Sequence, residues 1–112
     1  MRDLPTLAEL LEAAPIIKGW FSGGMAKPTL QEATAAYVGE GWLIAQGYNL
    51  LGDGGATTQS VDCMKACSEL DEFVTEANSV SAKKIGDGEL LKRWGPILAP
   101  IFLNLLKKWM GG

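Results

Sequence analysis

Residues 28–51 read PTLQEATAAYVGEGWLIAQGYNLL and carry the pattern of a capped helix. Thr29 and Glu32 have the spacing of a capping box, in which each side chain bonds the backbone N–H of the other residue. Apolar residues then recur at intervals of three and four. The pattern predicts a helix over about 29–51, which ends at the glycine-rich turn formed by residues 52–55.

Three glycines lie inside this predicted helix: Gly39, Gly41 and Gly47. A glycine in a helix interior costs about 1 kcal/mol relative to alanine. Glycines in helices let another backbone approach closely, which compensates for that cost. We therefore expect at least one of the three to make a tight helix–helix contact, within the chain or between copies. The alternative is a helix that breaks near residues 39–41.

The segment before this helix resembles it. Thr6 and Glu9 follow Pro5 with the same capping-box spacing, and apolar residues continue at helical intervals to Phe21. We predict a helix over about 6–21, kinked or split by Pro15. Two similar segments are too few to indicate a solenoid, which needs at least about three repeats.

A third helix is predicted over about 58–82, with an apolar stripe on one face and acidic residues on the rest. Cys63 and Cys67 are four residues apart on this helix, so their side chains run parallel on one face and cannot easily bond each other. We expect both thiols to be reduced and buried, which favours a reducing compartment.

The C-terminal segment carries one apolar face from Leu90 to Trp109 but contains Gly95, Pro96 and Pro100. Proline is tolerated in the first turn of a helix, where the backbone amides have no helical acceptor. We predict a short helix over about 89–94, a bend, and a last helix over about 97–110 that projects from the body. The whole chain, 1–112, is then a single all-α domain, a small bundle of four to five helices.

The projecting segment is uncharged from Trp94 to Leu106 and lies between two basic pairs, 92–93 and 107–108. A helix of that length reaches about 20 Å, short of the roughly 30 Å hydrocarbon layer of a membrane. Flanking tryptophans and lysines are typical of a helix that lies in a membrane interface, and the alternative is a helix that completes the protein's own core. We expect one side to dock on the subunit and the other to meet a neighbouring chain or lipid. The candidate interaction residues are Trp94, Ile101, Phe102, Leu103, Leu105, Lys107, Lys108, Trp109 and Met110.

The residue types argue against catalysis. The chain has no histidine, which excludes imidazole bases, histidine-activated nucleophiles and imidazole metal ligands. Two cysteines alone make a poor zinc site, and acidic residues along an amphipathic helix usually form a solvated face. Residues 52–55 lack the Lys-Ser/Thr that follows in a phosphate loop. We therefore expect no enzymatic activity, no cofactor, no metal and no small-molecule substrate.

Charge is distributed unevenly. Residues 1–82 contain four basic and eleven acidic residues, whereas residues 83–112 contain six basic and two acidic ones. An anionic partner would therefore meet the C-terminal end. Nucleic acid is an improbable partner, because an apolar stretch dilutes these basic residues and the acidic remainder would repel phosphates. The residues after Met1 lack the continuous apolar run of a secretory signal.

These exclusions leave three functional hypotheses. The favoured one is a non-enzymatic structural or interaction subunit of a larger assembly, such as a virion or a membrane-associated complex. It would contact itself or a neighbouring protein through glycine-lined helix faces and the apolar C-terminal helix. The first alternative is a peripheral protein whose C-terminal helix binds a membrane interface. The second is a soluble regulator that binds one protein through the acidic third helix.

Overall fold

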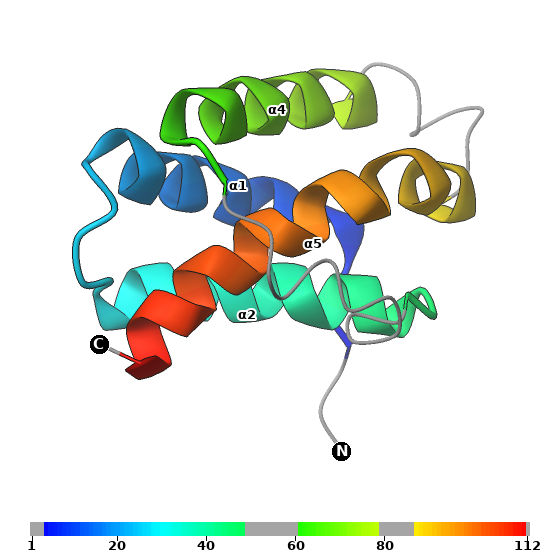
Figure 1. Cartoon of the computed structure of the whole chain (residues 1–112). Helices are drawn as coiled ribbons and strands as arrows, with labels where there is room; N and C mark the ends of the chain where they lie inside the picture. Colours follow the sequence, from blue (N-terminus) through cyan, green and yellow to red (C-terminus); the bar gives the residue numbers. More distant parts are fainter. Residues whose placement is uncertain (1–3, 49–60, 79–86, 112) are drawn as a thin grey trace.

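The computed structural model describes residues 4–48, 61–78 and 87–111, which form helices and contain no strand. The helices are α1 (Leu7–Ser22), α2 (Leu30–Ala45), α4 (Cys63–Glu76) and α5 (Asp87–Gly111). Figure 1 shows α4 and α2 on opposite sides of the molecule, with α5 running diagonally between them in front of α1. The predicted all-α bundle is confirmed.

The helices α1 and α2 begin in the same way. In both, a threonine side chain accepts a hydrogen bond from the backbone N–H of a glutamate three residues on, at 3.2 Å for Thr6 and for Thr29. The glutamates bond back to the threonine N–H groups, at 2.8 Å for Glu9 and 2.9 Å for Glu32. Both capping boxes are complete and both helices have sixteen residues. The internal resemblance of the sequence is therefore also a resemblance in structure.

These two helices also end alike. Gly24 and Gly47 have φ angles of +101° and +90°, a conformation that glycine adopts without steric cost. Past the end of α2, the N–H of Tyr48 donates to the carbonyl of Leu43 at 2.9 Å, as in a Schellman motif. An equivalent bond closes α1. The helix predicted over 29–51 therefore stops at Ala45, and residues 49–51 lie outside the described part of the chain.

The breaks predicted at the prolines are absent. The helix α1 continues through the exposed Pro15, and α5 continues through Pro96 and Pro100. Each proline removes one helical hydrogen bond, at about 3 kcal/mol. However, buried residues lie on both sides of the two prolines of α5, from Leu90 to Leu106, so both parts of this continuous helix are held against the core. The helix therefore packs on α2, α1 and α4 instead of projecting from the body.

The third predicted helix is shorter than expected at its start. Asp62 caps α4 by accepting a hydrogen bond from the Lys65 N–H at 3.0 Å, so the helix starts at Cys63 instead of residue 58. Residues 58–60 and 79–82 of the prediction lie outside the described part. Cys63 and Cys67 are unbonded as predicted, but both are only half-buried. Desolvation by neighbouring atoms nevertheless raises the pKa of the Cys67 thiol.

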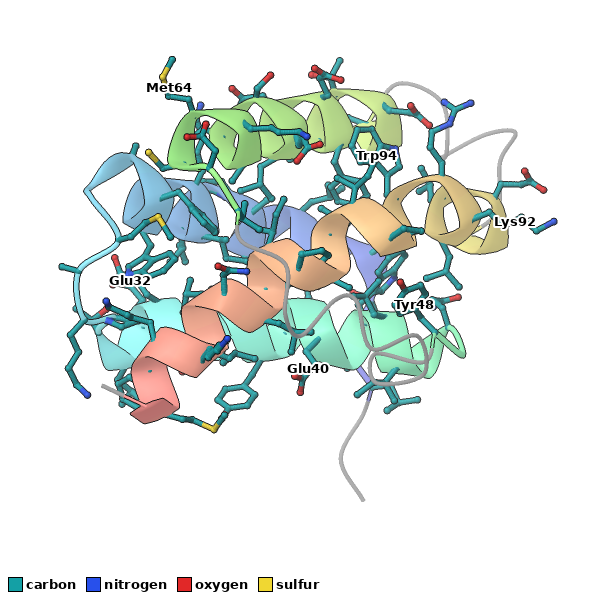
Figure 2. The ribbon with its side chains drawn as sticks, viewed as in Figure 1. Glu32, Glu40, Tyr48, Met64, Lys92 and Trp94 are labelled. Carbon is teal, nitrogen blue, oxygen red and sulfur yellow. The ribbon has the colours of Figure 1, made fainter. Side chains whose placement is uncertain are left out.

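Three aromatic rings, one each from α2, α4 and α5, meet in the core. The ring centroid of Phe73 lies 6.3 Å from that of Trp42 and 5.6 Å from that of Trp94. Figure 2 shows Trp94 between α4 and α5. The indole N–H groups of both tryptophans are buried and find no acceptor among the described residues. This cluster is apolar packing without a polar network, since no described polar or charged residue is buried.

We expect Thr29→Ala to lower the free energy of unfolding by about 1 kcal/mol, because it removes the side-chain acceptor that caps α2. Thr34→Ala is the matched control, since Thr34 is an exposed threonine inside the same helix whose hydroxyl only back-bonds the Leu30 carbonyl. It should change the free energy by less than about 0.5 kcal/mol. Urea unfolding followed by circular dichroism measures both. Equal effects of the two substitutions would contradict the capping assignment.

Candidate functional site

Exposed apolar side chains follow one line along α2. Leu30, Tyr37 and Ile44 expose 69, 45 and 54% of their surface and are spaced seven residues apart. Seven residues make about two helical turns, so the three side chains lie on one side of the helix. At the end of α5, Met110 is also 71% exposed.

An open groove of about 430 Å³ lies between α2 and the end of α5. It is lined by Tyr37, Glu40, Leu103, Leu106, Lys107 and Met110. Tyr37 belongs both to this groove and to the line along α2, so the two features form one surface. We call it the α2–α5 face and define it as Leu30, Tyr37, Glu40, Ile44, Leu103, Lys107 and Met110.

A close contact between the two helices supports this face. A Cβ atom at Gly39 would lie 2.6 Å from the ring of Phe102, so only glycine lets α5 approach α2 this closely. At the other end of the pair, a Cβ at Gly95 would lie 2.9 Å from the ring of Tyr48. Each helix thus carries a glycine that receives an aromatic ring from the other segment. Of the three glycines in the helix predicted over 29–51, Gly39 makes a tight contact with another helix.

The other two glycines act differently. A Cβ atom at Gly41 would lie 2.9 Å from the ring of Pro5, so Gly41 contacts the segment before α1 and not a helix. No atom lies within 4 Å of a Cβ at Gly47. Gly47 is therefore not a packing residue, and its positive φ angle serves the turn after α2.

The candidate residues of the C-terminal segment divide into three groups by burial. Trp94, Ile101, Phe102 and Leu105 are at most 5% exposed and belong to the core. Lys107, Lys108 and Met110 are exposed, whereas Leu103 and Trp109 are half-buried. Among the apolar candidates outside the core, only Met110 is highly exposed, at 71%. The main apolar side of α5 therefore faces the protein's own core, and the end of the helix contributes to the surface.

Trp109 is covered by the chain itself. The Lys27 ammonium group lies 6.0 Å from the centroid of the indole ring, close enough for a cation–π contact. Together with the exposed Lys107 and Lys108, this places three basic residues near one end of the bundle.

The residues of α2 that form the face were not identified from the sequence. The glycines and alanines of this helix indicated the side that packs on other helices, whereas Leu30, Tyr37 and Ile44 lie on a different side of the helix. Their spacing of seven was the available signal. Glu40 was also missed. Burial raises the pKa of its carboxyl above the usual value, and no described residue donates a hydrogen bond to it.

The acidic surface of α4 is partly engaged within the chain. The Lys18 ammonium contacts the Asp71 carboxylate at 2.8 Å, joining α1 to α4, and the hydrogen bond that Lys18 donates to Asp71 raises the pKa of Lys18. Arg93 of α5 contacts Glu76 at 2.8 Å. Water reaches both pairs, although Glu76 is partly buried, and this weakens them, so they orient the helices more than they stabilise them.

Within residues 4–48, 61–78 and 87–111, no three cysteine, aspartate or glutamate side chains gather closely enough to hold a metal ion. None of the helices described there is long and apolar enough to cross a membrane. Comparison with family models, curated proteins and solved structures finds no match to the chain.

We expect Gly39→Ala to lower the free energy of unfolding by about 1–3 kcal/mol, because the added methyl group overlaps the fully buried ring of Phe102. Gly19→Ala is the control: Gly19 is also helical, but a Cβ there meets no atom within 4 Å. It should raise stability by up to about 1 kcal/mol.

Both changes are measured by urea unfolding. Replacing the Phe102 ring with a smaller aliphatic side chain should relieve the overlap, so the loss from Gly39→Ala should shrink when it is combined with Phe102→Leu. If Gly39→Ala stabilises the protein as Gly19→Ala does, the close contact is wrong.

Proposed function

We propose that this protein is a non-enzymatic interaction subunit that binds a neighbouring protein in an assembly through the α2–α5 face. The observation that carries the proposal is the grouping of exposed apolar residues around one groove. Single exposed apolar residues are ordinary on protein surfaces. The line of three on α2 meets Leu103 and Met110 of α5 at Tyr37, and such a grouping of apolar residues on one surface is typical of an interaction site.

The composition of the face suits a protein partner. Tyrosine and methionine are enriched in interface centres, and Tyr37 and Met110 lie in the groove. The face is also rigid, because its two helices are held together by the Gly39–Phe102 contact below it. A rigid face loses little conformational entropy on binding, which favours affinity.

The groove offers little for catalysis. Its charged groups are one carboxylate, Glu40, and one ammonium group, Lys107, and the remaining lining is apolar apart from the Tyr37 hydroxyl. It contains no thiol or imidazole, and the absence of histidine extends to the whole chain. These residue types support binding in preference to nucleophilic or imidazole-based chemistry.

A membrane surface is a second candidate partner, favoured by the grouping of Lys27, Lys107 and Lys108 near Met110. Basic residues beside apolar ones attract a protein to anionic lipid. Two observations argue for a protein partner instead. Trp109 is half-buried beneath Lys27, and the main apolar side of α5 is occupied by the core, which leaves few side chains to enter a bilayer. The acidic α4 has less to offer a partner, since Asp71 and Glu76 are already in ion pairs.

The proposal is tested by the size of the native complex in extracts of cells that make the protein, measured by size exclusion with immunodetection. We expect the wild type to elute well above the 12.0 kDa of one chain. The double variant Tyr37→Lys with Met110→Lys should elute as a single chain, because charges would then lie in the apolar groove. Met64→Lys is the control: Met64 is 79% exposed on α4, away from the face, and its substitution should leave the complex intact.

Elution of the wild type at the mass of one chain would overturn the proposal. So would a complex that survives the double variant. If the wild type elutes as one chain, its flotation with vesicles is measured next. Flotation with vesicles of phosphatidylcholine and phosphatidylserine, but not with phosphatidylcholine alone, would assign the surface to anionic lipid.

A further inference from the structure

We infer that the neighbour bound by the α2–α5 face is a second copy of this chain, placed about a two-fold axis so that Glu40 of each copy pairs with Lys107 of the other. The inference rests on the proposed function and names its partner. It is carried by the distribution of charge over the face, the surroundings of Glu40 and the spacing of the apolar residues.

The face contains one charge of each sign. Glu40 comes from α2 and Lys107 from α5, and both line the groove between the helices. A two-fold interface brings the same surface of both copies together. Each contact between two different residues therefore occurs twice, once with each residue supplied by each copy. When the axis passes between Glu40 and Lys107, opposite charges meet at both places. A face with this distribution is complementary to itself.

Glu40 has no partner among the residues that the structure describes. Its carboxyl is partly buried, which raises its pKa, and no described residue donates a hydrogen bond to it. A half-buried carboxylate is stabilised by a cation brought close to it. Figure 2 shows Glu40 at the edge of α2 that faces away from α4. Lys107 of another copy would supply the missing charge.

The apolar residues of the face have the same spacing on both helices. Leu30, Tyr37 and Ile44 are separated by seven residues on α2, and Leu103 and Met110 by seven on α5. Repeats of seven on neighbouring helices form seams of the kind by which helices of separate chains pack. A second copy presents the same two seams, so the dimer would join four helices across the groove.

Charge reversal tests the pairing, with the mass of the purified full chain measured by light scattering. We expect the wild type to form a dimer of twice 12.0 kDa. Glu40→Lys alone and Lys107→Glu alone should each raise the dimer dissociation constant by roughly a hundredfold, because like charges then face each other at both places. An equimolar mixture of the two variants should recover the dimer, since both cross-chain pairs are again of opposite sign. Repair within one chain cannot explain recovery in the mixture.

The control pair is Glu72→Lys on α4 and Lys92→Glu in the first turns of α5, which alter the net charge equally at exposed positions outside the face. Both should remain dimeric alone and when mixed. Monomeric wild type at every concentration would overturn the inference. So would dimers that persist in the single variants, or a mixture that stays monomeric while both variants show native circular dichroism.

A measurement on the wild type keeps the test valid if a variant fails to fold. Met110 and Met64 are both highly exposed, but only Met110 lies in the face. On dilution, the methyl NMR signal of Met110 should shift while that of Met64 stays constant. Constant positions for both signals would contradict the inference. Purified protein that is monomeric, together with a native complex that depends on Tyr37 and Met110, would reject the second copy and leave the proposed function standing. A native species of single-chain mass would reject both.

Discussion

The close approach of α5 to α2 is the constraint on which the rest of the structure depends. The ring of Phe102 occupies the space that a side chain at position 39 would fill, and Gly95 receives Tyr48 in the same way. With α5 held there, Trp94 reaches Phe73 and the apolar core closes over Trp42. The same approach brings Leu103 and Met110 beside Tyr37, so the core and the candidate surface follow from one contact.

Local signals in the sequence were sufficient for helices whose ends are determined by nearby residues. The two capping boxes predicted the starts of α1 and α2 correctly, because a cap involves residues only three apart. The roles of the three glycines in and after α2 could not be predicted from neighbouring residues. Gly39, Gly41 and Gly47 are alike in sequence, but one meets Phe102, another meets Pro5, and the third adopts a positive φ. Their roles depend on residues brought near by the fold.

The continuity of α5 through its prolines and the exposure of one side of α2 both depend on contacts between segments that are distant in the sequence. Pro96 and Pro100 weaken a helix locally, and the burial of residues on both sides of them outweighs that cost. This burial depends on α2, which is distant in the sequence. Likewise, α2 is apolar on more than one side, and the docking of α5 determines which side remains open. The pattern of tryptophan and lysine at the C-terminus indicated a membrane or partner surface. In the structure, Trp94 is buried in the core and Trp109 lies under Lys27.

The separation of α2 and α5 along the chain also has a consequence for folding kinetics. The helices α1 and α2 are joined by a short connection and pack on each other, so this hairpin can form early. The contact between Gly39 and Phe102 requires closure of a much longer loop, which is slower. Before α5 docks, the side of α2 that Phe102 covers is open, in addition to the side that carries Tyr37. Apolar surface exposed during folding favours aggregation.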